Sequence, residues 1–156
     1  MRQLSRVNGS HETFITVIND GGSVTNADAQ GLCDCYIRYE ANHGKKGYYK
    51  MLQKGYASIR ETEFNYFIQL PDDYEVPSGF YSKAIAAWEG IKDADKVTLA
   101  LDCHPVRMKT PNWTGVASKL VTFCNRDYYL SQWMDLCYIT DRHKFAKIEI
   151  PDIDKK

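Results

Sequence analysis

The densest group of side chains that could bind a polar ligand lies between Lys54 and Glu63. Within it, Tyr56 offers an aromatic ring, Ser58 a hydroxyl and Glu61 a carboxylate, between two segments that read as strands. The second strand carries Gln69 on a face that we expect to be buried, and a buried amide must find hydrogen-bond partners. A cleft between subunits, with this polar segment as its lip, would supply them. The alternative is an ordinary solvated hairpin loop, because loops are polar in any case.

The common signatures of enzymes are absent from the sequence. It contains no phosphate-binding loop, no Gly-x-Gly-x-x-Gly, no His-Glu-x-x-His and no Gly-x-Ser-x-Gly. The four histidines (His11, His43, His104 and His143) are scattered, whereas zinc ligands usually come in close pairs, so we expect no metal site. Cys103 precedes His104, but neighbours on a strand point to opposite faces, which disfavours a thiolate–imidazole pair.

The composition fits one folded, cytoplasmic domain. A chain of 156 residues that is 44% hydrophobic can bury one core, and we expect a single domain over residues 1–156 with short disordered termini. Twenty basic residues balance twenty acidic ones, which argues against a nucleic-acid binder and a membrane-surface protein. No apolar stretch is long enough for a membrane span or a signal core, and five cysteines, an odd number, suit reduced thiols.

The residue pattern predicts alternating strands and helices. A β-branched run from Thr13 to Ile18 predicts a strand, and Thr25 with Asp28 resembles a capping box for a helix that ends at His43. Further strands are predicted over residues 48–52, 64–70 and 97–101. A second helix is predicted from Ser78, with a stripe formed by Tyr81, Ala84, Ile85, Trp88 and Ile91. The order βαββαβ is the ferredoxin-like arrangement of an α+β protein.

The strand over residues 64–70 carries large rings on both faces. Phe64, Tyr66 and Ile68 alternate with Phe67 and Gln69. A bare Phe67 face would be a liability for a monomer, so another subunit or the C-terminal segment should cover it. In that segment we expect a helix or strand over residues 114–123, a short helix over 127–134, and a hairpin extension formed by 136–140 and 145–150.

A spaced pattern from residue 47 to residue 104 resembles a known family. The pattern is Gly55-Tyr56-x-Ser58-x-x-Glu61-x-x-Phe64-x-Tyr66-x-Ile68, then Lys83-Ala84, Trp88 and Val97-x-Leu99. It resembles the small phage-encoded enzymes that degrade S-adenosylmethionine, long called hydrolases and better described as lyases. The resemblance implies a trimer of α–β sandwiches similar to the PII-like signalling proteins, with active sites between subunits and no metal or cofactor. It also implies methylthioadenosine and homoserine lactone as products, and depletion of the methyl donor that host restriction–modification uses.

The chemistry of such an enzyme needs no acid–base machinery. The sulfonium of the substrate is already a good leaving group, and the substrate's own carboxylate can attack its γ-carbon to close a five-membered lactone. The enzyme must hold carboxylate, carbon and sulfur in line, and orientation of this kind can contribute ~7–11 kcal/mol. A dry cleft would also destabilise the charged ground state. Positioning is therefore the whole expected mechanism.

Four residues are the expected site. We expect Gln69 to accept a hydrogen bond from the α-ammonium, at a position where the resemblance implies glutamate, so that this chain binds substrate and turns it over slowly. The alternative is that Gln69 is an interface amide with its hydrogen bonds satisfied by protein. Tyr56 is expected to contact the ligand with its ring, and Ser58 to bond the ribose or carboxylate. Glu61 is expected to bind substrate, or to pair with Arg60 or a neighbouring subunit instead.

Two other functions stay open on the sequence alone. One is a non-enzymatic PII-like module that binds a nucleotide or a host protein through the segment from Gly55 to Glu61. The other is attack on the sulfonium substrate by water, which gives homoserine instead of the lactone.

Overall fold

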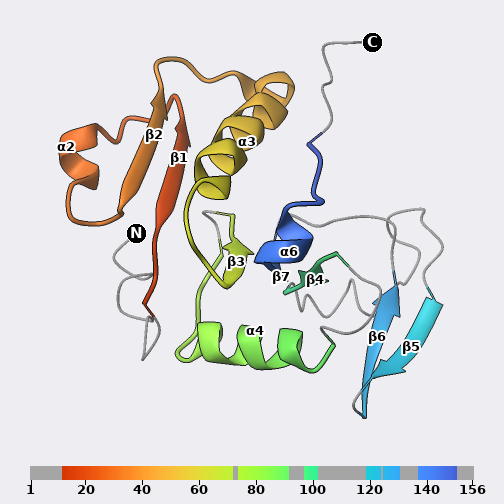
Figure 1. The fold of residues 1–156 in the computed structure, drawn as a ribbon. Helices are drawn as coiled ribbons and strands as arrows, with labels where there is room; N and C mark the ends of the chain where they lie inside the picture. The colour runs from red at the N-terminus through yellow and green to blue at the C-terminus, as the bar shows by residue number, and fades with distance from the viewer. Residues whose placement is uncertain are drawn as a thin grey trace. The chain divides into compact units, whose positions relative to one another are not determined.

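The chain forms a mixed α+β structure, as its sequence predicts (Figure 1). The computed structural model describes residues 12–71, 74–91, 97–101, 119–123, 125–130 and 137–150. The described residues divide into two compact units: one comprises those up to Glu63 and those from Ile148 on, the other those from Phe64 to Lys147. No helix in the described ranges combines the length and apolar character needed to cross a membrane. The single domain expected from the chain length stays a prediction.

The first unit is built on a pair of parallel strands. Strand β1 (Thr16–Asp20) and strand β2 (Cys35–Tyr39) run side by side in the register Thr16 to Cys35, joined by the short helix α2 (Asn26–Ala29). Helix α3 (Gly44–Arg60) packs against β1 (Figure 1). The contact is close, because a Cβ at Gly55 would overlap the side chain of Ile18 on β1.

Helix α3 corrects the sequence analysis, which placed a strand at residues 48–52 and a loop after it. Met51, Leu52 and Tyr56 are all buried, at a spacing that puts them on one helical face. Gly47 and Gly55 are buried as well, so these glycines serve close packing inside the helix and do not interrupt it. The segment is therefore one continuous helix of 17 residues.

The first predicted helix is confirmed at its start and wrong in its length. Thr25 is the N-cap and forms the predicted capping box with Asp28, through reciprocal backbone and side-chain hydrogen bonds. The helix ends after one turn, and Gly31 follows with a left-handed φ of 74°. The chain then turns into β2, where the sequence analysis had continued the helix to His43.

The last described residues, 148–150, belong to the first unit. The side-chain amide of Gln53 donates to the carbonyl of Ile150 at 3.1 Å. The guanidinium of Arg60 donates to the carbonyl of Ile148. Both donors lie on α3, so this helix ties the end of the described chain to the unit that contains the beginning.

The second unit contains a three-stranded antiparallel sheet in the order β3-β7-β4. Strand β7 (Tyr138–Asp141) lies in the middle, between β3 (Tyr66–Gln69) and β4 (Leu99–Ala100). Strands β5 (Lys119–Phe123) and β6 (Arg126–Leu130) form a separate antiparallel pair. The short helix predicted over residues 127–134 is therefore wrong for its first part, which is strand β6, and residues 131–134 lie outside the described ranges.

Helix α4 (Phe80–Glu89) covers one face of this sheet with the predicted apolar stripe (Figure 1). Ala84, Trp88 and Ile91 form a buried core with Ile139 of β7. Partly buried hydrophobic side chains that pack against this core are Tyr66, Ile68, Ile85, Leu99 and Leu101. The N-cap is Gly79, with a left-handed φ of 69°, and not Ser78. The stripe is thus confirmed and the start of the helix shifts by one residue.

The other face of β3 is covered from within the chain. Phe67 packs against Phe145 with ring centroids 4.4 Å apart, and against Tyr138 at 5.9 Å. Phe145 belongs to helix α6 (Arg142–Phe145), so the C-terminal segment covers the Phe67 face, one of the two predicted alternatives. Phe64 also contacts Phe145, so it lies on the side of Phe67 and not on that of Tyr66 as predicted. The reason is that β3 begins only at Tyr66, so the alternation of a strand does not extend to Phe64.

The predicted hairpin between residues 136–140 and 145–150 is wrong. Strand β7 exists, but it pairs with β3 and β4, and helix α6 follows it directly. Asp141 is the N-cap of α6, and its carboxylate accepts the backbone N–H of Lys144 at 2.8 Å. This cap turns the segment into a helix where the sequence analysis expected a hairpin turn.

Candidate functional sites

The four residues expected to bind substrate lie in two different units. Tyr56 and Ser58 are on α3, and Glu61 follows this helix as its C-cap. Gln69 is the last residue of β3, in the second unit. The segment from Gly55 to Glu61, predicted as a loop at the lip of the cleft, is therefore the C-terminal end of a helix.

Within α3, Ser58 and Glu61 share a side and Tyr56 does not. Residues two apart on a helix face different directions, whereas residues three apart are neighbours. Tyr56 is only 2% exposed and belongs to the core. Ser58 and Glu61 are exposed, and the Ser58 hydroxyl donates to the carbonyl of Gly55 at 2.8 Å. Ser58 and Glu61 are thus the pair that one ligand could contact from solvent.

Gln69 is half-buried and lies opposite Tyr138 in the antiparallel register. Directly opposed residues share a face of a sheet, so Gln69 is on the same face as Tyr138 and Phe67. The neighbouring Tyr66 lies on the other face, where its hydroxyl donates to Glu89 at 2.8 Å. Tyr66 thus packs on the core side of the sheet, and Gln69 lies beside aromatic rings on the other face.

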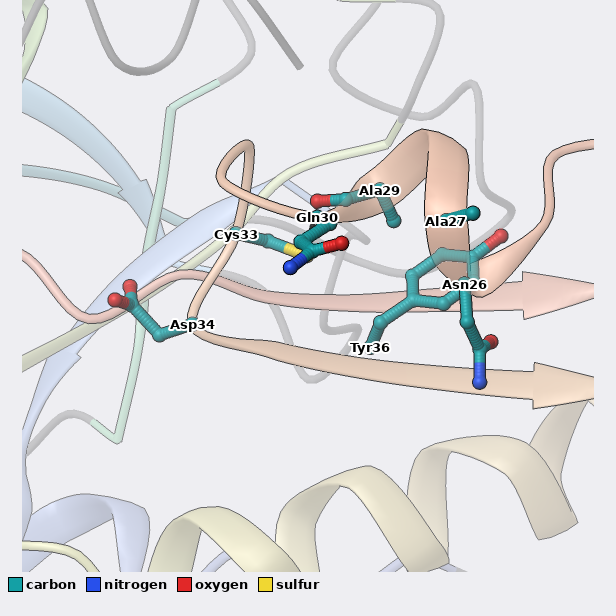
Figure 2. A pocket seen from close by; sticks show the side chains of 7 residues that line it. All are labelled: Asn26, Ala27, Ala29, Gln30, Cys33, Asp34 and Tyr36. Carbon is teal, nitrogen blue, oxygen red and sulfur yellow. Dashed lines mark hydrogen bonds between the residues drawn. The ribbon is translucent and has the colours of Figure 1, made fainter.

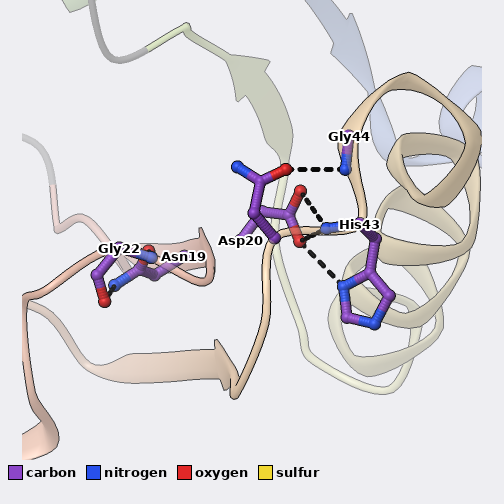
Figure 3. A network of polar contacts seen from close by, with 6 residues as sticks. Asn19, Asp20, Gly22, His43 and Gly44 are labelled. Carbon is purple, nitrogen blue, oxygen red and sulfur yellow. Dashed lines mark hydrogen bonds and ion pairs between the residues drawn. The ribbon is translucent and has the colours of Figure 1, made fainter.

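A second polar constellation, which the sequence analysis did not predict, joins the end of β1 to the start of α3 (Figure 3). Asp20 is the last residue of β1 and His43 immediately precedes α3. The Asp20 carboxylate accepts the His43 backbone N–H at 3.0 Å and lies 2.9 Å from its ring Nδ1. A carboxylate whose pKa is lowered stays ionised and only accepts hydrogen bonds, so Nδ1 carries the proton. In the neutral ring, the other nitrogen, Nε2, then holds the lone pair.

Two neighbours, Gly47 and Tyr39, fix the position of the His43 ring. A Cβ at Gly47 would overlap the Cβ of His43, so glycine at this position leaves room for the imidazole. The Tyr39 ring, at the end of β2, meets the imidazole edge-on at 5.2 Å. Gly21, with a left-handed φ of 75°, lies too close to the backbone of Asn42 to carry a Cβ. Glycine at this position lets the loop after β1 meet the loop before α3. The His43 side chain is nevertheless 47% exposed.

The hydrogen bonds to Asp20 predict a pH dependence of stability. The side-chain hydrogen bond from His43, and then the backbone one, lower the pKa of Asp20 below its ordinary value of 3.8. A carboxyl whose pKa is lower in the folded state stabilises the fold above the ordinary value, and this contribution disappears as the pH falls through the lowered pKa. Between about pH 4 and pH 2, the free energy of unfolding should fall more steeply for the wild type than for Asp20→Asn. Urea unfolding across this range measures both slopes, and equal slopes would show that the bonds are not made in solution.

A pocket of about 350 Å³ lies between α2 and β2, lined by Asn26, Ala27, Ala29, Gln30, Cys33, Asp34 and Tyr36 (Figure 2). Several of its polar groups are already engaged. The Asp34 carboxylate accepts the backbone N–H of Ile15 at 2.6 Å, and the Tyr36 hydroxyl donates to the carbonyl of Val24 at 2.8 Å. Burial raises the pKa of the Cys33 thiol, so it stays protonated and is a poor nucleophile. The pocket offers shape and the amides of Asn26 and Gln30, with no group poised for chemistry.

Cys33, Cys35 and Cys137 are free thiols. In the described ranges, no cluster of three or more histidine, cysteine or acidic side chains could hold a metal ion. Cys103 and His104, and also His11, lie outside the described residues. The Asp20–His43 pair had no local signal in the sequence, because 23 positions separate its members.

No family model, curated protein or solved structure matches the chain.

Proposed function

We propose that this protein cleaves S-adenosylmethionine to methylthioadenosine and homoserine lactone, as a lyase. The observation that carries the proposal is the spaced pattern from Gly55 to Ile68, with its continuation at Lys83, Trp88 and Val97. Its residues have distinct places in the structure. Gly55 and Tyr56 hold helix α3 in the core, Ser58 and Glu61 are on the exposed side, and Gln69 ends the strand that follows.

Each polar residue takes a part that suits its placement. Ser58 and Glu61 are exposed neighbours, so they bind the ribose hydroxyls or the amino-acid end of the substrate. Gln69 offers its carbonyl oxygen to the α-ammonium, and the rings on its face supply apolar surface near the sulfonium. Tyr56 supports the helix from within and does not contact the ligand, because its side chain is buried.

The reaction requires only that the substrate adopt the conformation for in-line attack. The substrate carboxylate forms a bond to its γ-carbon while the carbon–sulfur bond breaks, and the electron pair of that bond neutralises the sulfonium. No proton is transferred. The site therefore has to bend the methionine arm and exclude water, and both tasks suit hydroxyl, amide and aromatic groups.

The finer architecture belongs to the same proposal. The resemblance implies a ferredoxin-like sandwich related to the PII-like proteins, assembled as a homotrimer with sites between subunits. It places the protein in the cytoplasm of a phage-infected bacterium, where loss of the methyl donor disables restriction–modification. Light scattering measures the mass in solution, and a monomer at micromolar concentration would contradict this part of the proposal.

Product analysis tests the activity. The protein is incubated with S-adenosylmethionine in ¹⁸O-labelled water, beside the Gln69→Glu variant, and the products are resolved by chromatography and mass spectrometry. Methylthioadenosine with homoserine lactone, or with the opened form of that lactone, is the expected result. Homoserine labelled at its γ-hydroxyl means that water attacked the sulfonium substrate. Homoserine labelled at its carboxyl means that a lactone formed first and then opened.

Unchanged S-adenosylmethionine with both proteins would overturn the proposal. A non-enzymatic PII-like module is then the remaining function of the two that the sequence left open. Binding of S-adenosylmethionine without cleavage, measured by calorimetry, would identify that module as a sensor of the same ligand.

A further inference from the structure

The His43 imidazole is not needed to cap helix α3. The preferred N-cap residues are Ser, Thr, Asp and Asn, because their side chains accept a backbone N–H of the first turn. The Asn42 side-chain oxygen accepts the backbone N–H of Gly44 at 2.7 Å and so makes this bond at the start of α3, whereas the His43 side chain makes no such bond. Its imidazole is bonded to Asp20 instead, at the end of a different element. Asn42 therefore leaves the His43 imidazole without a capping task.

We propose that Asp20 and His43 form a general-base dyad that activates water to hydrolyse a carboxylic ester. The carboxylate fixes the ring in the tautomer with the proton on Nδ1, which leaves Nε2 as the proton acceptor. Nε2 belongs to a side chain that is 47% exposed, so water and a small ligand can reach it. The ring is held by Asp20, by the space at Gly47 and by the edge of Tyr39, so it does not have to be ordered when a substrate arrives.

The substrate that we assign is the five-membered lactone released by S-adenosylmethionine cleavage, and this assignment rests on the proposed function. Ser58 lies 15 residues after His43, which corresponds to about 22 Å along a helix at ~1.5 Å per residue. The dyad is thus remote from the exposed pair Ser58 and Glu61. It acts on a product that has left the cleavage site, and it makes cleavage irreversible by consuming that product.

The step balances without a further reactant. His43 Nε2 takes a proton from water, and the hydroxide oxygen forms a bond to the lactone carbonyl carbon. The tetrahedral intermediate collapses, the ring carbon–oxygen bond breaks, and the leaving oxygen takes the proton from Nε2. The product is homoserine. Its newly formed carboxylic acid group releases its proton to solvent.

The titratable groups around the imidazole are few in the part of the chain that the structure describes. Asp20 faces Nδ1 from β1, and Tyr39 faces the ring from β2. Lys54 of α3 lies over the ring of Tyr39, 5.1 Å from its centroid. Of these three groups, only Asp20 forms a hydrogen bond with the imidazole.

Added L-homoserine lactone tests the dyad without S-adenosylmethionine. The opening rate is followed by NMR at neutral pH and compared with buffer alone. The wild type is expected to open the lactone faster than buffer, and His43→Gln is expected to fall to the buffer rate. Asp20→Asn, which removes the charge that orients the ring, is expected to be slower by at least about tenfold. His143→Gln is the matched control, because His143 is an exposed histidine that has no carboxylate partner among the described residues.

A wild-type rate equal to buffer, or equal rates for wild type and His43→Gln, would overturn the inference. Nitrogen NMR of the wild type gives a readout that does not depend on variants folding: a proton on Nε2 instead of Nδ1 would overturn it as well. The lactone assay uses no S-adenosylmethionine, so the two proposals fail separately. Lactone opening without S-adenosylmethionine cleavage would support the dyad as an esterase site. It would show only that the lactone does not come from a cleavage reaction of this protein.

Discussion

Replacing Trp88 by alanine is expected to lower the free energy of unfolding by ~3–5 kcal/mol, the largest effect of any single change considered. The Trp88 side chain is completely buried between α4 and the sheet, where it packs with Ala84, Ile91 and Ile139. Truncation would remove most of these contacts and leave a cavity that the rigid strand β7 cannot close. Urea unfolding followed by circular dichroism measures the loss.

Trp88→Phe is expected to cost far less, about 1 kcal/mol. The indole Nε1 is buried and has no hydrogen-bond partner among the described residues, so the native side chain carries an unsatisfied donor. Phenylalanine keeps an aromatic ring in the core and removes this donor, which offsets part of the lost packing. Lys83→Ala, an exposed change on the same helix, is the control and should stay within about 0.5 kcal/mol of the wild type. Equal losses for the two Trp88 variants would mean that the indole N–H is satisfied.

Gln69→Glu is expected to raise kcat/KM for S-adenosylmethionine cleavage by about five- to tenfold. A carboxylate accepts the hydrogen bond of the α-ammonium with charge assistance, which roughly doubles the strength of a bond worth ~1 kcal/mol. The side chain is half-buried, so water screens this pairing less than it would at the surface. Release of methylthioadenosine, measured by chromatography over a range of substrate concentrations, gives the two rates.

Asn65→Asp is the control for Gln69→Glu. It places the same new charge on an exposed side chain just before β3 and should leave kcat/KM unchanged. Equal acceleration by both variants would mean that charge near the strand, and not a contact at position 69, sets the rate. Equal rates for wild type and Gln69→Glu would remove Gln69 from the site.

The parts of the fold that the sequence predicts correctly are those set by neighbouring residues. The capping box of Thr25 and Asp28 needs only three positions, and the stripe from Tyr81 to Ile91 needs only helical spacing. The strand at β7 was predicted, but its pairing was predicted wrongly. Its partners β3 and β4 are distant in the chain, and nothing local to Tyr138 specifies them. The polar residues that follow β7, from Asp141 to Lys144, favoured a hairpin because only local residues entered the prediction.

Helix α3 was missed because its residues have opposing propensities. Tyr48 and Tyr49 favour strands, and glycines at 47 and 55 are unfavourable inside helices. Both glycines lie where another side chain approaches too closely for a Cβ, which is a property of the folded structure. The Asp20–His43 pair was missed for a related reason, since the two residues meet only after β1 and α3 have taken their places.

The ties from α3 to the carbonyls of Ile148 and Ile150 have a consequence for synthesis on the ribosome. The second unit is continuous in the chain, so all of its residues have been made once Lys147 has been added. The first unit begins earlier but is completed later, because Gln53 and Arg60 must wait for partners that are translated almost a hundred residues afterwards. The order of translation and the order of completion are therefore reversed.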